Sequence, residues 1–204
     1  MEYGSVNGTV VLEERALLSG ARRLSGRFPY NSRATISDGG RSGGRPRKEE
    51  IASHAFRYRI ENTSENLFLL GGHDYNRPLA SRAAGTLKVS DSADAVTFEA
   101  MIDRETQDIS WVADILRALD AGLIGGISPA FRLPPPRAVA KAEETYEEDP
   151  AEGTAIIRRI IEALLYEFSL VSVPAYPETS IESEERSAGG IILPKPHPLK
   201  RWRL

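Results

Sequence analysis

The sequence predicts a mainly β fold with flanking helices, of the α+β class, and two observations carry this prediction. Short apolar runs closed by glycine or proline recur between residues 67 and 177, which is typical of strands. One stretch, residues 106–122, instead has apolar residues three or four positions apart, the spacing of one helix face. With 204 residues the chain has room for one sizeable domain and tails.

The first predicted strands are residues 67–72 (LFLLGG), 85–90 (GTLKVS) and 95–102 (AVTFEAMI). In the last of these, apolar and polar residues alternate, as on a half-buried strand. We expect these three to lie in an antiparallel sheet. Residues 154–161 and 163–176 are two further β-rich runs, and the second is apolar on both alternating faces, so it should be a central strand.

The predicted helix precedes the stretch GGISPAF, residues 125–131. Thr106 is a candidate N-cap, and Gly122 is a candidate for the end of the helix. The apolar positions spaced three or four apart are Ile109, Val112, Leu116, Leu119 and Leu123.

Differences in composition along the chain divide it into three regions. Residues 1–46 are expected to be poorly defined and only partly structured, with β-favouring residues at 26–37 and an exposed glycine and arginine loop over 37–50. Residues 47–181 should form the folded domain, within which 51–60 could start a helix or a strand. The proline-rich and acidic residues 133–153 should form a mobile loop, and 182–204 a flexible tail.

Composition excludes several kinds of chemistry. The chain has no cysteine, so disulfides and thiol catalysis are ruled out, and its three histidines stand too far apart for a zinc cluster. A formal net charge of −3 gives no reason to expect nucleic-acid binding. We expect no cofactor, no membrane span and, for want of an export signal, a location in the cytoplasm.

Ser128 is the first candidate for chemistry, because Gly125 and Gly126 leave little bulk around its hydroxyl. A turn serine that satisfies a nearby backbone group is the alternative. Pro129 has no amide hydrogen, so the residue after the candidate nucleophile cannot donate to an oxyanion.

His73 follows another glycine pair at the end of an apolar run, and a histidine there could serve as a general base. Packing against Tyr75 in a loop is the alternative. Glu167 interrupts the apolar run 163–173, and a carboxylate in a central strand needs a partner. That partner could be His73, or Arg158 or Arg159 in a structural ion pair.

Asp74 is a rival acid for His73, but neighbours in an extended chain point to opposite sides, so it ranks second. The residues then provide a hydroxyl, an imidazole and a carboxylate in the chain order His, Ser, Glu. Triads occur in several sequence orders, so the order does not exclude one.

Three segments carry a family resemblance: GGHDYNRPLASRAAGTLKVSDSADAVTFEAMI, then ILRALDAGLIGGISPAFRL, then LYEFSLVSVPAYPETSI. Together with RKEEIASHAF before them, they resemble the prohead proteases of tailed bacteriophages over about residues 47–181. The shared blocks are His-Asp-Tyr with a following Pro-Leu, Gly-x-Ser-x-x-Phe, Glu-x-Ser-Leu-Val and Pro-Ala-Tyr.

This family is similar to the herpesvirus maturational proteases, and the resemblance implies a compact antiparallel β-barrel flanked by helices. It also implies that His73, Ser128 and Glu167 are the catalytic residues. An arginine-assisted oxyanion site like that of the herpesvirus enzymes would fall on Arg158 and Arg159.

The resemblance implies a serine endopeptidase that processes scaffold or major capsid protein inside the procapsid, in the cytoplasm of the bacterial host, with self-cleavage as a further activity. It makes the portal a candidate partner and a homodimer a candidate assembly. The alternative function is a catalytically silent assembly or scaffolding protein that uses the same fold to bind coat subunits.

Overall fold

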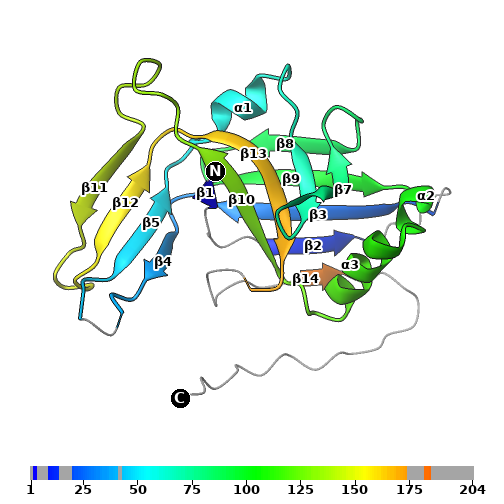
Figure 1. The fold of residues 1–204 in the computed structure, drawn as a ribbon, viewed down its shortest axis with the longest axis horizontal. Coiled ribbons are helices and arrows are strands. Elements are labelled where there is room, and N and C mark those ends of the chain that lie inside the picture. Colours follow the sequence, from blue (N-terminus) through cyan, green and yellow to red (C-terminus); the bar gives the residue numbers. More distant parts are fainter. Residues whose placement is uncertain (1, 4–8, 14–19, 41–42, 174–181, 185–204) are drawn as a thin grey trace.

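The computed structural model describes residues 2–3, 9–13, 20–40, 43–173 and 182–184, and its fold is mainly β, as predicted. Its strands form three sheets, here called A, B and C. In Figure 1, sheet C lies at the left, and β10 and β13 of sheet A cross in front of the strands of sheet B.

Sheet A is the sheet on which the candidate residues lie, and its five strands are listed here in spatial order: β1 (Glu2–Tyr3), β10 (Gly126–Arg132), β13 (Leu164–Val171), β6 (Phe68–Gly71) and β7 (Asp74–Ser81). Sheet B has the order β14 (Glu182–Glu184), β2 (Thr9–Glu13), β3 (Arg22–Pro29), β9 (Ala95–Ile102) and β8 (Leu87–Asp91). Sheet C has the order β11 (Glu143–Glu147), β12 (Ile156–Ile160), β5 (Arg47–Ile51) and β4 (Arg33–Ser37).

The helices of the described residues are α1 (Arg57–Glu61), α2 (Arg104–Gln107) and α3 (Ser110–Asp120). None of them is long and apolar enough to cross a bilayer. The segment 51–60, for which the sequence allowed either a helix or a strand, contains the last residue of β5 and most of α1.

The sheets are not purely antiparallel, in contrast to the expectation. β13 runs parallel to β6, β12 runs parallel to β5, and β14 runs parallel to β2. None of the three sheets closes on itself within the part of the chain that the structure describes, so the expected barrel is not confirmed. The central place predicted for the run 163–176 is confirmed, because β13 is the middle strand of sheet A.

The core between sheets A and B contains a chain of phenylalanine rings. Phe168 of β13 stacks on Phe98 of β9 with ring centroids 5.6 Å apart, and Phe28 of β3 lies 6.4 Å from Phe168. Phe56 continues the chain from Phe28 to Phe131 of β10, at 6.0 and 5.7 Å. These separations are typical of favourable aromatic pairs, so the rings fix how the strands of sheet A face the core.

The helix before residue 125 is shorter than predicted and begins differently. Asp103, rather than Thr106, caps the first turn: its carboxylate accepts a hydrogen bond from the Thr106 amide at 2.7 Å. The helix is then interrupted at residues 108–109, between α2 and α3. The end is as predicted, because Gly122 directly follows the cap residue Ala121 and has a φ of +69°, which is typical of the glycine after a helix.

Two segments that were expected to be loops contain strands of sheet C. Residues 47–51 form β5, and residues 143–147, within the acidic stretch 133–153, form β11. The reason is charge pairing across the sheet, since Arg158 of β12 bonds to Glu49 of β5 and to Glu143 of β11. Opposite charges on neighbouring strands stabilise the pairing of segments that look hydrophilic in sequence.

Glu182–Glu184, at the start of the expected tail, forms β14 beside β2. The rest of that tail, residues 185–204, lies outside the described residues. β3, which belongs to the region expected to be poorly defined, pairs with β9 along its full length of eight residues.

The turn between β6 and β7 consists of Gly72 and His73, because Gly71 pairs directly with Asp74. Both turn residues have positive φ, at 63° and 62°. This is the form of two-residue hairpin turn that matches the twist of the flanking strands. Glycine adopts it without strain, whereas histidine rarely does.

A hydrogen-bond cluster joins Asp91 of β8 to the residue directly after β3 and to the segment before α1. The hydroxyl of Tyr30 donates to Asp91 Oδ1 at 2.6 Å, and the ring of His54 bonds through Nδ1 to the other oxygen of Asp91. Tyr30 is only 5% exposed. Burial and the hydrogen bond to Asp91 raise the pKa of Tyr30 well above its ordinary value.

We predict that Tyr30→Phe lowers the free energy of unfolding by about 1–3 kcal/mol, because the buried Asp91 carboxylate loses a donor. Urea denaturation measures this change. Tyr58→Phe is the matched control, since Tyr58 is 60% exposed, and its effect should stay within about 0.5 kcal/mol. Equal losses in the two variants would contradict the role given to the Tyr30 hydroxyl.

Alkaline pH should act through the same group. The folded-state pKa of Tyr30 is raised, so its contribution to stability is complete below the unfolded pKa of about 10 and is lost as the pH rises further. Wild-type protein should therefore lose more unfolding free energy above about pH 10 than Tyr30→Phe does. Parallel curves for the two proteins would show that Tyr30 does not titrate in this way.

We predict that Gly72→Ala destabilises the protein by about 1–2 kcal/mol, because an L side chain disfavours this backbone conformation. Apart from Gly72 itself and its two chain neighbours, no residue has a heavy atom within 4 Å of the position of a Cβ at Gly72, so the cost is conformational and not a collision. Gly72→Asn should cost less, since asparagine tolerates positive φ. Thermal denaturation of both variants tests the order, and an alanine variant as stable as wild type would contradict it.

Candidate active site

The candidate site lies on one face of sheet A, opposite the face that packs into the core. Along β13, Phe168 and Leu170 belong to the hydrophobic core. Side chains alternate along a strand, so Glu167 and Ser169 project from the other face. Both are fully buried, at 0% exposure.

Ser128 lies on the same face as these two residues. The antiparallel register of β10 and β13 pairs Ser128 with Ser169, and Ala130 with Glu167. Residues that face each other across two strands share a side of the sheet, with Cα atoms about 4.5–5.5 Å apart. Ser128 is 6% exposed, so its hydroxyl stands in a nearly enclosed position beside Ser169.

His73 reaches the same face from the turn after β6. β6 runs parallel to β13 with Gly71 beside Leu170, and the Gly72 amide donates to the Leu170 carbonyl at 3.0 Å. The ring of His73 then turns back over β13, where its Nδ1 lies 2.6 Å from Glu167 Oε1.

This hydrogen bond defines the protonation of the neutral ring. An ionised carboxylate only accepts, so the shared proton belongs to Nδ1 of His73 and the lone pair to Nε2. The side chain of His73 is 21% exposed. An imidazole held in this tautomer keeps its acceptor lone pair on Nε2, which is the arrangement of a general base.

Ser169 completes the hydrogen bonding of Glu167 and was not singled out from the sequence as a site residue. Its hydroxyl donates to Glu167 Oε2 at 2.7 Å and accepts a hydrogen bond from the backbone amide of His73 at 2.8 Å. The signal was present in the sequence: two polar residues two positions apart in an apolar strand share one face.

The structure decides between the alternatives for Glu167 and His73. The hydrogen-bond partners of Glu167 are His73 and Ser169, so the ion pair with Arg158 or Arg159 was not the correct alternative. Asp74, the rival acid, instead accepts from the Asn76 amide at 2.8 Å.

The arginines proposed for an oxyanion site are engaged elsewhere. Arg158 pairs with Glu49 and Glu143, and Arg159 pairs with Glu50 at 3.4 Å. These carboxylates belong to sheet C. Their ion pairs give Arg158 and Arg159 a structural role there, so the oxyanion assignment has no support from these contacts.

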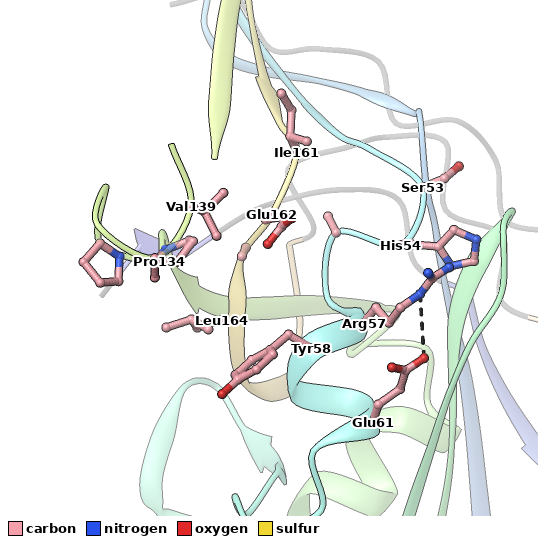
Figure 2. A pocket seen from close by; sticks show the side chains of 14 residues that line it. Ser53, His54, Arg57, Tyr58, Glu61, Pro134, Val139, Ile161, Glu162 and Leu164 are labelled. Atoms are coloured by element: carbon pink, nitrogen blue, oxygen red, sulfur yellow. Dashed lines mark ion pairs between the residues drawn. The ribbon is translucent and has the colours of Figure 1, made fainter. Parts of the chain in front are cut away.

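A separate pocket of about 850 Å³ lies beside α1 and the segment after β10. Figure 2 shows His54 and Arg57 on one side of it and Pro134, Val139 and Leu164 on the other. Its lining contains none of the three candidate catalytic residues. Within the described residues, no group of three or more histidine, aspartate or glutamate side chains is placed to hold a metal ion.

Comparison with known proteins places the chain in a family. No curated protein and no solved structure gave a significant match. The family model described as caudovirus prohead serine protease matches residues 38–190, a span that includes the hairpin turn of His73, the strand of Ser128 and the strand of Glu167. Because the match covers more than half of the 204 residues, the chain belongs to the caudovirus prohead serine proteases.

Proposed function

We propose that the protein is a serine endopeptidase in which Ser128 is the nucleophile, His73 the general base and Glu167 the orienting acid. Membership of the prohead serine protease family supports a peptidase that acts in capsid maturation. The observation that carries the residue assignment is the 2.6 Å hydrogen bond between His73 Nδ1 and Glu167 Oε1 on the face from which Ser128 projects.

In the first half of the reaction, Ser128 Oγ attacks the carbonyl carbon of the scissile peptide bond while His73 Nε2 takes the hydroxyl proton. The tetrahedral intermediate then collapses, and the C–N bond breaks as the imidazolium returns this proton to the leaving amine. An acyl-enzyme on Ser128 remains.

In the second half, water attacks the acyl carbon and gives a proton to His73 Nε2. Cleavage of the ester bond releases the carboxylic acid and restores the Ser128 hydroxyl with that proton. Glu167 stays ionised throughout and stabilises the imidazolium, which forms in each half. Pro129 has no amide hydrogen, so donors to the oxyanion must come from other groups of the site.

The proposed substrates are the major capsid protein or the scaffold inside the procapsid, assembled in the host cytoplasm. Trimming of the chain's own ends and contact with the portal belong to the same proposal, as does a homodimer. A further part of the proposal is that the fold is related to that of the herpesvirus proteases and forms a closed barrel.

We predict that Ser128→Ala and His73→Ala each lower the rate of coat or scaffold cleavage by at least about 10³-fold, because each removes a group that reacts directly. Glu167→Gln should cost less, since nucleophile and base remain. Gel analysis of the purified enzyme mixed with capsid or scaffold protein measures this. Ser90→Ala, on β8 of sheet B, is the control and should cleave at the wild-type rate. Full processing by Ser128→Ala would end the proposal.

We also predict that a fluorophosphonate labels wild-type protein at Ser128 and does not label Ser128→Ala. Labelling requires a hydroxyl made nucleophilic by its base, so His73→Ala should react far more slowly. Mass spectrometry of tryptic peptides locates the label. A wild-type protein that resists the reagent but still binds coat subunits would favour the catalytically silent assembly protein.

A further inference from the structure

Ser169 is fully buried, and a buried hydroxyl destabilises a protein unless it is hydrogen-bonded. Its neighbours along β13, Phe168 and Leu170, belong to the hydrophobic core. Both bonds of the hydroxyl go to the proposed active site: it accepts from the His73 amide at 2.8 Å and donates to Glu167 Oε2 at 2.7 Å. The hydroxyl therefore serves the site rather than the sheet.

The direction of these bonds is fixed by chemistry. A backbone amide can only donate, so the oxygen of Ser169 is the acceptor toward His73. A serine has one hydroxyl hydrogen, and it must then point at Glu167 Oε2. With Oε2 held by Ser169, the carboxylate plane is set so that Oε1 faces His73 Nδ1.

The same hydroxyl acts on the strained turn. His73 has φ of 62°, a conformation that non-glycine residues adopt at a cost. Its amide is held by Ser169 and its ring by Glu167, two residues of the same strand. Because both ends of His73 are tied to β13, the turn and the ring keep one orientation relative to the strand that pairs with Ser128.

We propose that Ser169 is a positioning residue for the reaction: its hydroxyl orients Glu167 and the backbone of His73 together, so that Nε2 is presented toward Ser128. This rests on the proposed function, because the benefit of positioning Nε2 is the transfer of the Ser128 proton. Ser169 itself does not contact the reacting atoms in this scheme.

The kinetic test compares Ser169→Ala with Ser169→Thr and Ser169→Cys. We expect Ser169→Ala to lower kcat by about 10- to 100-fold, the effect of losing a hydrogen bond to a charged group, with KM changed less than about 2-fold. Threonine keeps the hydroxyl and should restore most of kcat. A thiol is a weak donor, so Ser169→Cys, which preserves the shape, should resemble alanine. If packing alone matters, cysteine will instead resemble wild type and the proposal is wrong.

Ser81→Ala is the matched control, because Ser81 lies in β7 of the same sheet, two strands from β13, and its hydroxyl accepts from the Ala84 amide at 3.2 Å. It should keep wild-type kcat. An equal loss in Ser81→Ala would show that any serine hydroxyl of sheet A has this effect and would overturn a specific role for Ser169.

A second measurement does not need activity. In the Ser128→Ala background, hydrogen exchange of the His73 amide should accelerate by at least about 10-fold when Ser169 becomes alanine, because its acceptor is lost. The imidazole Nδ1 proton signal in NMR spectra should weaken or move upfield. Unchanged exchange and an unchanged signal would overturn the positioning role.

The two proposals fail separately. If Ser128→Ala still processes substrate, the triad proposal falls, while the exchange measurement still decides whether Ser169 holds His73 and Glu167. If Ser128→Ala is inactive but Ser169→Ala keeps wild-type kcat, the positioning role alone is wrong.

Discussion

The buried carboxylate of Glu167 is the constraint on which the site depends. Glu167 lies at 0% exposure in the middle strand of sheet A. An ionised group buried there without partners would lower the stability of the fold by roughly several kcal/mol. His73 Nδ1 and the Ser169 hydroxyl satisfy its two oxygens. The requirement to satisfy this one charge therefore accounts for the tautomer of His73, for the serine at 169 and for the hydrogen bonds that hold a strained turn.

Strand direction brings these groups together. β6 runs parallel to β13, so the end of β6 and the His73 turn arrive beside the end of β13. β10 runs antiparallel to β13, so its beginning, with Ser128, arrives at the same place. The core supports this arrangement, because stacking of Phe168 on Phe98 keeps one face of β13 toward sheet B and leaves Glu167 and Ser169 on the other. A shift of β13 by one residue would exchange the two faces.

His54 shows that a histidine bound to a buried carboxylate is not enough to define a catalytic site. Like His73 it has positive φ, at 64°, and its Nδ1 bonds to a carboxylate, that of Asp91. Asp91 also accepts from the buried Tyr30 hydroxyl, so the cluster ties β8 to the residue after β3 and to the segment before α1. At His73, in contrast, Ser128 lies on the same face of the sheet. This is why the proposed catalytic assignment falls on His73, in a chain that belongs to the prohead serine proteases.

Local sequence determined the strand at residues 95–102, the central place of the strand at 164–171 and the helix end at Gly122. Each has a local signal: alternating apolar and polar residues, a continuous apolar run, and a glycine that can adopt positive φ. Local sequence also indicated that Glu167 needs a partner. Only the tertiary structure decided that this partner is His73 rather than Arg158 or Arg159, since the choice depends on which strands lie side by side. The strands at 47–51 and 143–147 were missed for the same reason: charges from β12 stabilise them across sheet C, and such non-local pairing leaves no periodic pattern in either segment.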